Sequence, residues 1–134
     1  MSRADDELAI RSLVARLAHE ADMGTDLDDY AALFTEDAVW ELPDAPPRVG
    51  REAIREGAAL RRAAGGVGPG SATRHVVGTQ AVEVRGDEAT SHAYFLFYEA
   101  TASQPRLKLM GHYHDTLRRE GGQWRMAHRR ITIG

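Results

Sequence analysis

The sequence contains no cysteine, so disulfide bonds, thiolate catalysis and cysteine-ligated metal centres are excluded. It has no apolar run approaching the roughly 20 residues that a helix needs to cross a bilayer. Residues 1–7 are acidic and lack the apolar core of a signal peptide. We therefore expect a cytoplasmic protein without a membrane partner. The net charge of −3 gives no general attraction for phosphate backbones, so no nucleic-acid partner is expected.

Recognisable nucleophile and cofactor motifs are also missing. No serine stands in a nucleophile elbow, and no Rossmann glycine fingerprint is present. The glycine-rich residues 65–70 follow no strand pattern and precede no Gly-Lys-Ser/Thr, so they do not match a phosphate-binding loop. The chemistry that remains is proton transfer by side chains, and no cofactor is expected.

What the sequence does have is the composition of an ordinary globular protein. Of its 134 residues, 43% are hydrophobic and 28% are charged, which is enough to bury a substantial core. No linker or internal repeat divides the chain. Residues 1–134 are therefore predicted to form one domain.

Helical patterns occupy the first half of the chain. Apolar residues at helical spacing predict a first helix, with Asp22 beside its apolar stripe rather than opposite it. Gly24 and the residue after it interrupt this helix. Asp26 is a good N-cap for a second helix, whose apolar face would include Tyr30 and Phe34. A third helix is predicted from Gly50 to about residue 64.

Most of the strand patterns lie in the second half. A short strand is predicted at residues 37–42 and longer ones at about 73–84, 88–101, 106–119 and 123–133. The segments between the longer strands are rich in glycine, proline and other turn residues, which is typical of hairpins. Helices followed by an antiparallel meander indicate an α+β protein.

Polar residues on apolar strand faces are the first candidate site residues. The odd positions of residues 106–119 are predicted to be buried, and they include Tyr113 and Asp115. A buried Asp115 would face a ligand, or it would bond to neighbouring backbone or an arginine. Gly111 on the same face leaves room for a ligand or a helix to approach.

The strand at residues 88–101 adds a second carboxylate. Residues 93–98 are nearly all apolar, which predicts burial on both faces of the strand. Glu99 lies on the face of Phe95 and Phe97. It is either an acid or base with a raised pKa or a solvated carboxylate at the strand end.

Histidine and arginine side chains complete the candidates. His75, in a strand pattern, is either an acid–base group or an ordinary strand histidine. His112 and His114 share one strand face, but no third ligand is evident, so no metal site is predicted. Arg129 would neutralise an internal carboxylate, bind an acidic substrate group or lie at the surface.

Several fragments, in this order and spacing, together resemble a known family. They are LVARLAHEAD at 13–22, DLDDYAALFTEDAVW at 26–40, GREAI at 50–54, TRH at 73–75, GHYHD at 111–115 and GQWRMAHR at 122–129. The resemblance is to the nuclear transport factor 2-like superfamily, and within it to the SnoaL-like group that includes scytalone dehydratase. It covers nearly the whole chain.

The resemblance implies a fold and a set of acid–base residues. The fold would be a cone in which three N-terminal helices pack on a strongly curved antiparallel sheet around a deep pocket. Matched by motif, the aspartate and histidine of the dehydratase-like members fall on Asp22 and His75, with further site positions at Glu99 and Arg129. Asp26 is a rival for Asp22. A tyrosine common in the family is replaced by Leu17.

We therefore predict a cofactor-independent lyase of the dehydratase type. His75, oriented by Asp22, would remove a proton alpha to a carbonyl, and its conjugate acid would assist departure of hydroxide. Glu99 or Tyr113 would position the leaving group or the enolate oxygen. The predicted substrate is a hydrophobic, ring-containing small molecule. The residues predicted to contact it are Phe34, Trp40, Phe95, Phe97, Leu109, Tyr113 and Asp115.

Two alternatives use the same pocket. One is a polyketide cyclase or ketone isomerase with the same base, and the other is a non-catalytic domain that binds a small molecule. In each case a homo-oligomer, a dimer or trimer, is expected through the outer face of the sheet. Met110, Tyr94 and Tyr98 are the candidates for that contact.

Overall fold

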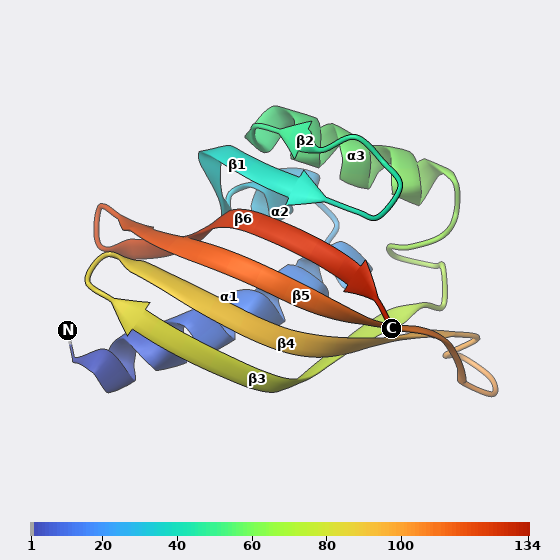
Figure 1. Ribbon diagram of the computed structural model, residues 1–134. Coiled ribbons are helices and arrows are strands. Elements are labelled where there is room, and N and C mark those ends of the chain that lie inside the picture. Colours follow the sequence, from blue (N-terminus) through green and yellow to red (C-terminus); the bar gives the residue numbers. More distant parts are fainter. Residues whose placement is uncertain (1) are drawn as a thin grey trace.

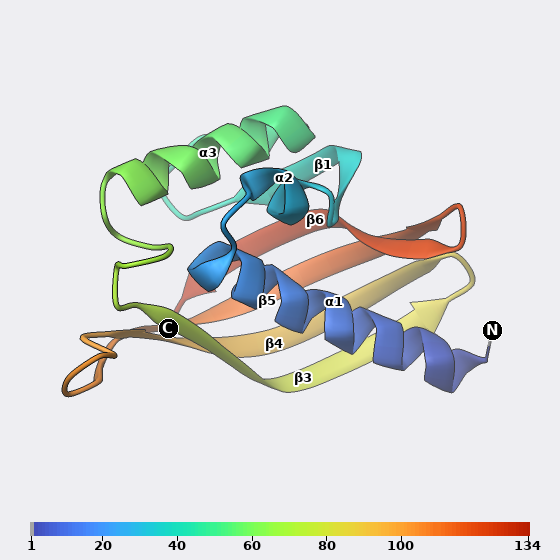
Figure 2. The ribbon, with the colours of Figure 1, turned by 180° about the vertical axis from the view of Figure 1, so that it is seen from behind.

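The computed structural model describes residues 2–134 and packs three helices on one face of a curved six-stranded sheet (Figures 1 and 2). The helices are α1 (Arg3–Met23), α2 (Leu27–Ala31) and α3 (Arg51–Ala63). The strands are β1 (Phe34–Glu41), β2 (Arg48–Val49), β3 (Arg74–Arg85), β4 (Glu88–Glu99), β5 (Arg106–Glu120) and β6 (Gln123–Ile133). The predicted α+β class and curved sheet are confirmed.

The order of the strands is β2-β1-β6-β5-β4-β3, and it corrects two details of the prediction. Strand β1 pairs with β6 in parallel, with Trp40 opposite Arg129, so the sheet is mixed rather than antiparallel. Strands β1 and β2 precede α3, so the three helices do not form one N-terminal block, although a strand at residues 37–42 had been predicted before the third helix. Turn chemistry reports only pairing between neighbours in the chain. The β1–β6 pair leaves no such local signal, because α3 and four strands lie between its members in the chain.

Helix α1 lies across the sheet (Figure 2). Side chains from β5 and β6 hold its start. A capping box joins Ser2 and Asp5. The buried Asp6 carboxylate accepts hydrogen bonds from Arg119 Nη1 at 2.7 Å and from Trp124 Nε1 at 3.1 Å. No helix within residues 2–134 is both long enough and apolar enough to span a membrane.

Helix α2 is shorter than predicted. Asp26 is its N-cap, as expected, and its carboxylate accepts from the Asp28 N–H at 2.8 Å. The helix ends at Ala31, however, and Phe34 is the first residue of β1, opposite Met126 of β6. The prediction that Phe34 lies on a helix was therefore wrong. The pairing of Phe34 with β6 ends the helix early. Sequence periodicity cannot reveal this pairing.

The two faces of the sheet differ sharply. Tyr113 and Asp115 are buried on the helix side, as the alternation in β5 predicted, while His112 and His114 lie on the other face. The prediction that residues 93–98 are buried on both faces of the strand was wrong, because Tyr94 is 43% exposed. Within residues 2–134 no helix covers this outer face (Figure 1). The predicted pairing of copies through it remains a prediction.

Candidate active site

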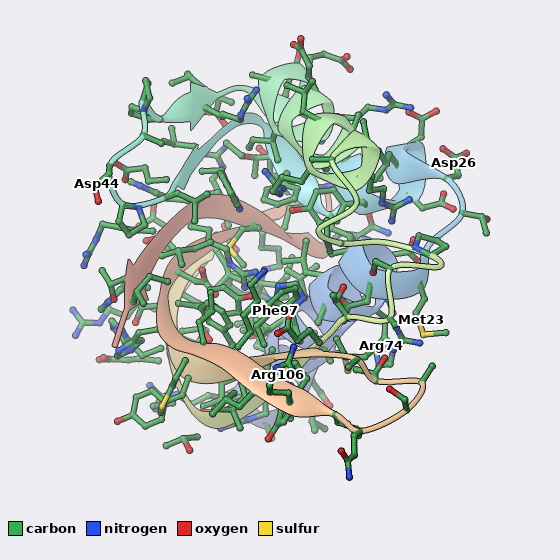
Figure 3. The ribbon with its side chains drawn as sticks, turned by 90° about the vertical axis from the view of Figure 1, so that its right-hand side faces the viewer. Met23, Asp26, Asp44, Arg74, Phe97 and Arg106 are labelled. Atoms are coloured by element: carbon green, nitrogen blue, oxygen red, sulfur yellow. The ribbon has the colours of Figure 1, made fainter. Side chains whose placement is uncertain are left out.

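A cavity of about 330 Å³ lies between the helix-covered face of the sheet and the three helices. Its wall is mainly apolar. Four of the residues predicted to contact substrate line it, namely Trp40, Phe95, Phe97 and Leu109. Figure 3 looks at the molecule from the end where α1 finishes, and Phe97 points into the interior. Phe34 is fully buried in the core and does not line the cavity, so its predicted contact with substrate is not supported.

The Asp22 carboxylate and His75 meet at the wall of this cavity. Asp22, in the last turn of α1, is only 3% exposed. Its Oδ1 lies 2.7 Å from His75 Nδ1, and its Oδ2 accepts a hydrogen bond from the His75 backbone N–H at 2.8 Å. Because a carboxylate only accepts, Nδ1 is the donor, and the lone pair of the neutral ring is on Nε2. His75 lines the cavity, so Nε2 is the nitrogen available to a ligand.

The end of α1 is fixed from α3. Helix α1 has no basic residue in its own last turn to bond its final carbonyls. Arg62 supplies these bonds, with Nη1 donating to the Gly24 carbonyl at 2.7 Å and Nη2 donating to the carbonyls of Glu20 and Ala21 at 2.7 and 3.1 Å. Arg62 therefore holds the turn that carries Asp22. Its role was missed, because nothing in the local sequence links α3 to α1.

The strand register fixes His75 from the other side. His75 is paired with Phe97 across β3 and β4, and the two ring centroids are 4.6 Å apart. Asp26, the rival carboxylate, is exposed and bonds to its own helix rather than to His75. Of the two aspartates, only Asp22 is placed to orient the imidazole.

Tyr113 forms a second wall of the cavity. Its ring stacks on Phe95, with centroids 4.4 Å apart and planes inclined by 15°. A side chain at Gly111, directly opposite Phe95 on β5, would collide with the Phe95 ring. The space that this glycine leaves is thus filled by Phe95, and not by a ligand or a helix as expected.

Arg129 and Asp115 form a buried ion pair next to Tyr113. Arg129 Nε and Nη2 donate to the two Asp115 carboxylate oxygens, both at 2.9 Å. Burial disfavours the charged guanidinium, but the Asp115 carboxylate more than offsets this, so the pKa of Arg129 is raised. The guanidinium carbon lies 3.7 Å from the centre of the Tyr113 ring. Arg129 thus neutralises an internal carboxylate, as one of its interpretations held, and it also lines the cavity. Asp115 does not line the cavity.

Tyr30 is a cavity residue that the sequence did not reveal. It lies in α2, is 5% exposed and lines the cavity together with Leu17. Burial raises the pKa of both Tyr30 and Tyr113, so both phenols stay protonated and can donate a hydrogen bond. Neither hydroxyl has a hydrogen-bond partner within residues 2–134. The helical spacing of Tyr30 predicted only that it lies on the apolar face of its helix. Periodicity cannot distinguish a tyrosine in the core from one that lines a cavity.

Arg61 was also missed, and it brings a positive charge to the apolar wall. Its guanidinium carbon lies 4.3 Å from the centre of the Trp40 ring. Burial lowers the pKa of Arg61 because it disfavours the charged form. Within residues 2–134 no carboxylate forms an ion pair with it. This guanidinium is therefore available to an anionic group of a ligand.

Glu99 lies apart from these residues. Its carboxylate accepts two hydrogen bonds from Arg106, from Nε at 3.0 Å and from Nη2 at 2.7 Å. The Arg106 guanidinium lowers the pKa of Glu99, so the raised value considered for it was wrong. Glu99 does not line the cavity, and it is left out of the site proposed below.

Comparison with known proteins gives the family. Residues 2–130 match the model of the SnoaL-like domain. The chain belongs to the SnoaL-like family. No curated protein matches it.

Solved structures similar to this SnoaL-like chain come from several bacteria. A protein of unknown function from Mycobacterium tuberculosis is 30% identical, with a TM-score of 0.84, and the match covers 98% of this chain and 78% of that one. A protein from Novosphingobium aromaticivorans, provisionally assigned as a scytalone dehydratase, is 20% identical at a TM-score of 0.75, covering 98% and 85%. ActVI-ORFA from Streptomyces coelicolor is 22% identical at 0.79, covering 95% and 96%. The likeness to these last two structures shows only that they share the fold of this chain.

Proposed function

We propose that this SnoaL-like protein is a cofactor-independent lyase that removes water from a hydrophobic, ring-containing small molecule. The observation that carries the proposal is the Asp22–His75 pair, which presents one free imidazole nitrogen to an apolar cavity of about 330 Å³. A cavity of this size and apolar character suits a ring system. Membership of the SnoaL-like family supports a small-molecule substrate.

The proposed reaction is an acid–base elimination. His75 Nε2 takes a proton from the carbon alpha to a carbonyl, while Nδ1–H donates to Asp22 and so stabilises the imidazolium that forms. The electrons of the broken C–H bond form an enolate and then a C=C bond as the C–O bond to the leaving hydroxyl breaks. The imidazolium returns its proton to that hydroxide, which leaves as water, and the enzyme is restored.

Two phenols are placed to stabilise the enolate. Tyr30 and Tyr113 both line the cavity, and both stay protonated because burial raises the pKa of each. A hydrogen bond donated to the developing oxyanion stabilises the transition state more than the ground state. Tyr30 thereby supplies the phenol that the family's tyrosine would supply at the position of Leu17. Tyr113, already a candidate from the sequence, assists it.

The direct test of the reaction is the mass of the product. We expect incubation with ring-containing β-hydroxy ketones to give products lighter by one water, and no such product with His75→Ala. A product of unchanged mass but altered absorbance would replace the lyase by the isomerase or cyclase alternative. A ligand that binds in the cavity and is recovered unchanged would replace it by the non-catalytic alternative.

Arg61 leads to a prediction about the substrate. Its unpaired guanidinium in an apolar wall favours a substrate with an acidic or phenolate oxygen at that end of the cavity. A hydrogen bond to a charged group contributes about 1.5–3 kcal/mol, so Arg61→Gln should raise KM for such a substrate by roughly 10–150-fold. A neutral analogue should show little change. Steady-state kinetics on both substrates measures the difference.

Arg55→Gln is the matched control for this prediction. Arg55 is on the same helix, pairs with Asp28 and does not line the cavity. Its replacement should leave KM for both substrates unchanged. Equal effects of Arg61→Gln on the charged and neutral substrates would contradict recognition of an anion by Arg61.

A further inference from the structure

The outer face of the sheet carries three histidines from two neighbouring strands. His92 of β4 lies directly opposite His114 of β5, and His112 is two positions before His114 on the same face. One potential ligand nitrogen from each of the three rings lies within 4.8 Å of the others. This is the face turned toward the viewer in Figure 1, on the opposite side of the sheet from α1 and the cavity. The sequence showed only the His-x-His pair, because the third member comes from another strand.

The three rings are close to the geometry of a metal site. The rings of His112 and His114 are stacked with centroids 4.1 Å apart, and His92 stands edge-on to them at 5.9 and 5.4 Å. Tetrahedral Zn²⁺ with Zn–N bonds of about 2.0–2.1 Å places its ligand nitrogens roughly 3.3 Å apart. His92 is exposed, so rotation of its side chain can close the remaining gap without disturbing the core.

The hydrogen bonds of these rings leave ligand capacity free. His112 Nε2 is buried and has no hydrogen-bond partner within residues 2–134. A buried polar nitrogen without a partner is destabilising, and a bond to a metal would remove that penalty. His114 Nε2 has one weak partner, the Thr132 hydroxyl at 3.2 Å, which a metal ion would displace or share.

The histidine cluster has a positive charge beside it and no carboxylate within it. Arg130 of β6 is paired with His114 and is exposed on the same face. Its positive charge opposes a bound cation, though solvent screens it. The cluster contains no carboxylate, so the donors are imidazole nitrogens alone, which suit zinc, nickel and copper rather than calcium or magnesium.

We propose that His92, His112 and His114 bind one divalent transition-metal ion per chain on the outer face of the sheet. Three imidazole ligands leave a fourth position of a tetrahedral ion open to water or to an external group. The site is independent of the proposed lyase reaction, since Asp22 and His75 lie on the other side of the sheet.

The test is a calorimetric titration of the untagged, metal-free protein with Zn²⁺ alone. The wild-type chain should take up one ion per chain, and His92→Ala should weaken binding by at least about 10–100-fold, the loss known for merely outer-shell partners of metal ligands. His92 is exposed, so this variant should keep its fold. Arg130→Gln should tighten binding, because it removes a positive charge beside the ion.

Two controls separate this site from other histidines. His19→Ala removes an exposed histidine of α1, and His75→Ala removes the cavity histidine; neither should change the affinity for Zn²⁺. As a second readout, Zn²⁺ should raise the melting temperature of the wild type but not that of His92→Ala. Absence of saturable Zn²⁺ uptake by the wild type, or equal affinity of His92→Ala, would overturn the proposal.

Discussion

Replacing Asp22 with asparagine or His75 with alanine is expected to lower turnover by about 10²–10⁴-fold, the usual contribution of a well-placed acid–base group. His75→Ala removes the proposed base itself. Asp22→Asn keeps the size of the side chain but changes which ring nitrogen carries the proton. The measurement is kcat on a substrate identified by product mass, with circular dichroism showing that each variant is folded.

The effect of Asp22→Asn follows from the two hydrogen bonds that the carboxylate makes. An asparagine can accept from the His75 backbone N–H with its oxygen, but its amide nitrogen then faces His75 Nδ1. Since that nitrogen is a donor, Nδ1 must become the acceptor, and the neutral ring carries its proton on Nε2. Nε2 can then no longer act as a base toward a ligand in the cavity.

Asp26→Asn is the matched control, because it makes the same substitution at the rival carboxylate. Asp26 caps α2 and does not contact His75, and asparagine is also a good N-cap, so turnover should stay at the wild-type level. The double variant Asp22→Asn with His75→Ala should be about as slow as His75→Ala alone, because the two residues act as a unit. Near-normal turnover in both single variants would remove this pair from the mechanism.

Breaking the buried Asp115–Arg129 pair is expected to lower the free energy of unfolding by about 3–5 kcal/mol, because the remaining charge stays buried without its partner. The two side chains are 0% and 7% exposed, and two parallel hydrogen bonds join them. Asp115→Ala leaves the guanidinium unpaired, and Arg129→Met leaves the carboxylate unpaired. Urea denaturation at neutral pH measures the loss for each variant.

The double variant Asp115→Leu with Arg129→Met provides the sharper comparison. It leaves no buried charge, so it should lose less stability than the sum of the single variants. Glu83→Gln is the surface control: it breaks the exposed ion pair with Arg85 and should leave the urea midpoint unchanged. Single variants within about 1 kcal/mol of the wild type would mean that the pair behaves like a surface ion pair.

Local patterns in the sequence were sufficient for most of the fold. The apolar stripe of α1, the N-cap at Asp26 and the alternation in β5 each depend on residues close in the chain, and the structure has all three. The pairing of Asp22 with His75 was also expected, through the family resemblance rather than through spacing. Its geometry is present in the structure, and its catalytic role is the proposal tested above.

What was missed depends on contacts between distant segments. Tyr30 was predicted only as an apolar helix residue, and Arg61 lies outside the matched motifs, so neither was recognised as a cavity residue. Nothing in the local sequence indicated that Glu99 pairs with Arg106 and does not line the cavity. His92 joins the other two outer histidines only through the register of β4 on β5.

The sequence by itself determined the α+β class, the elements with strong periodicity and the family. The tertiary structure alone decided that β1 runs parallel to β6, that Phe34 belongs to the core, and which polar groups share the cavity. The physical reason is the range of each signal. Periodicity and capping record energies within a few neighbouring residues, whereas strand register and cavity walls are set by packing between segments far apart in the chain.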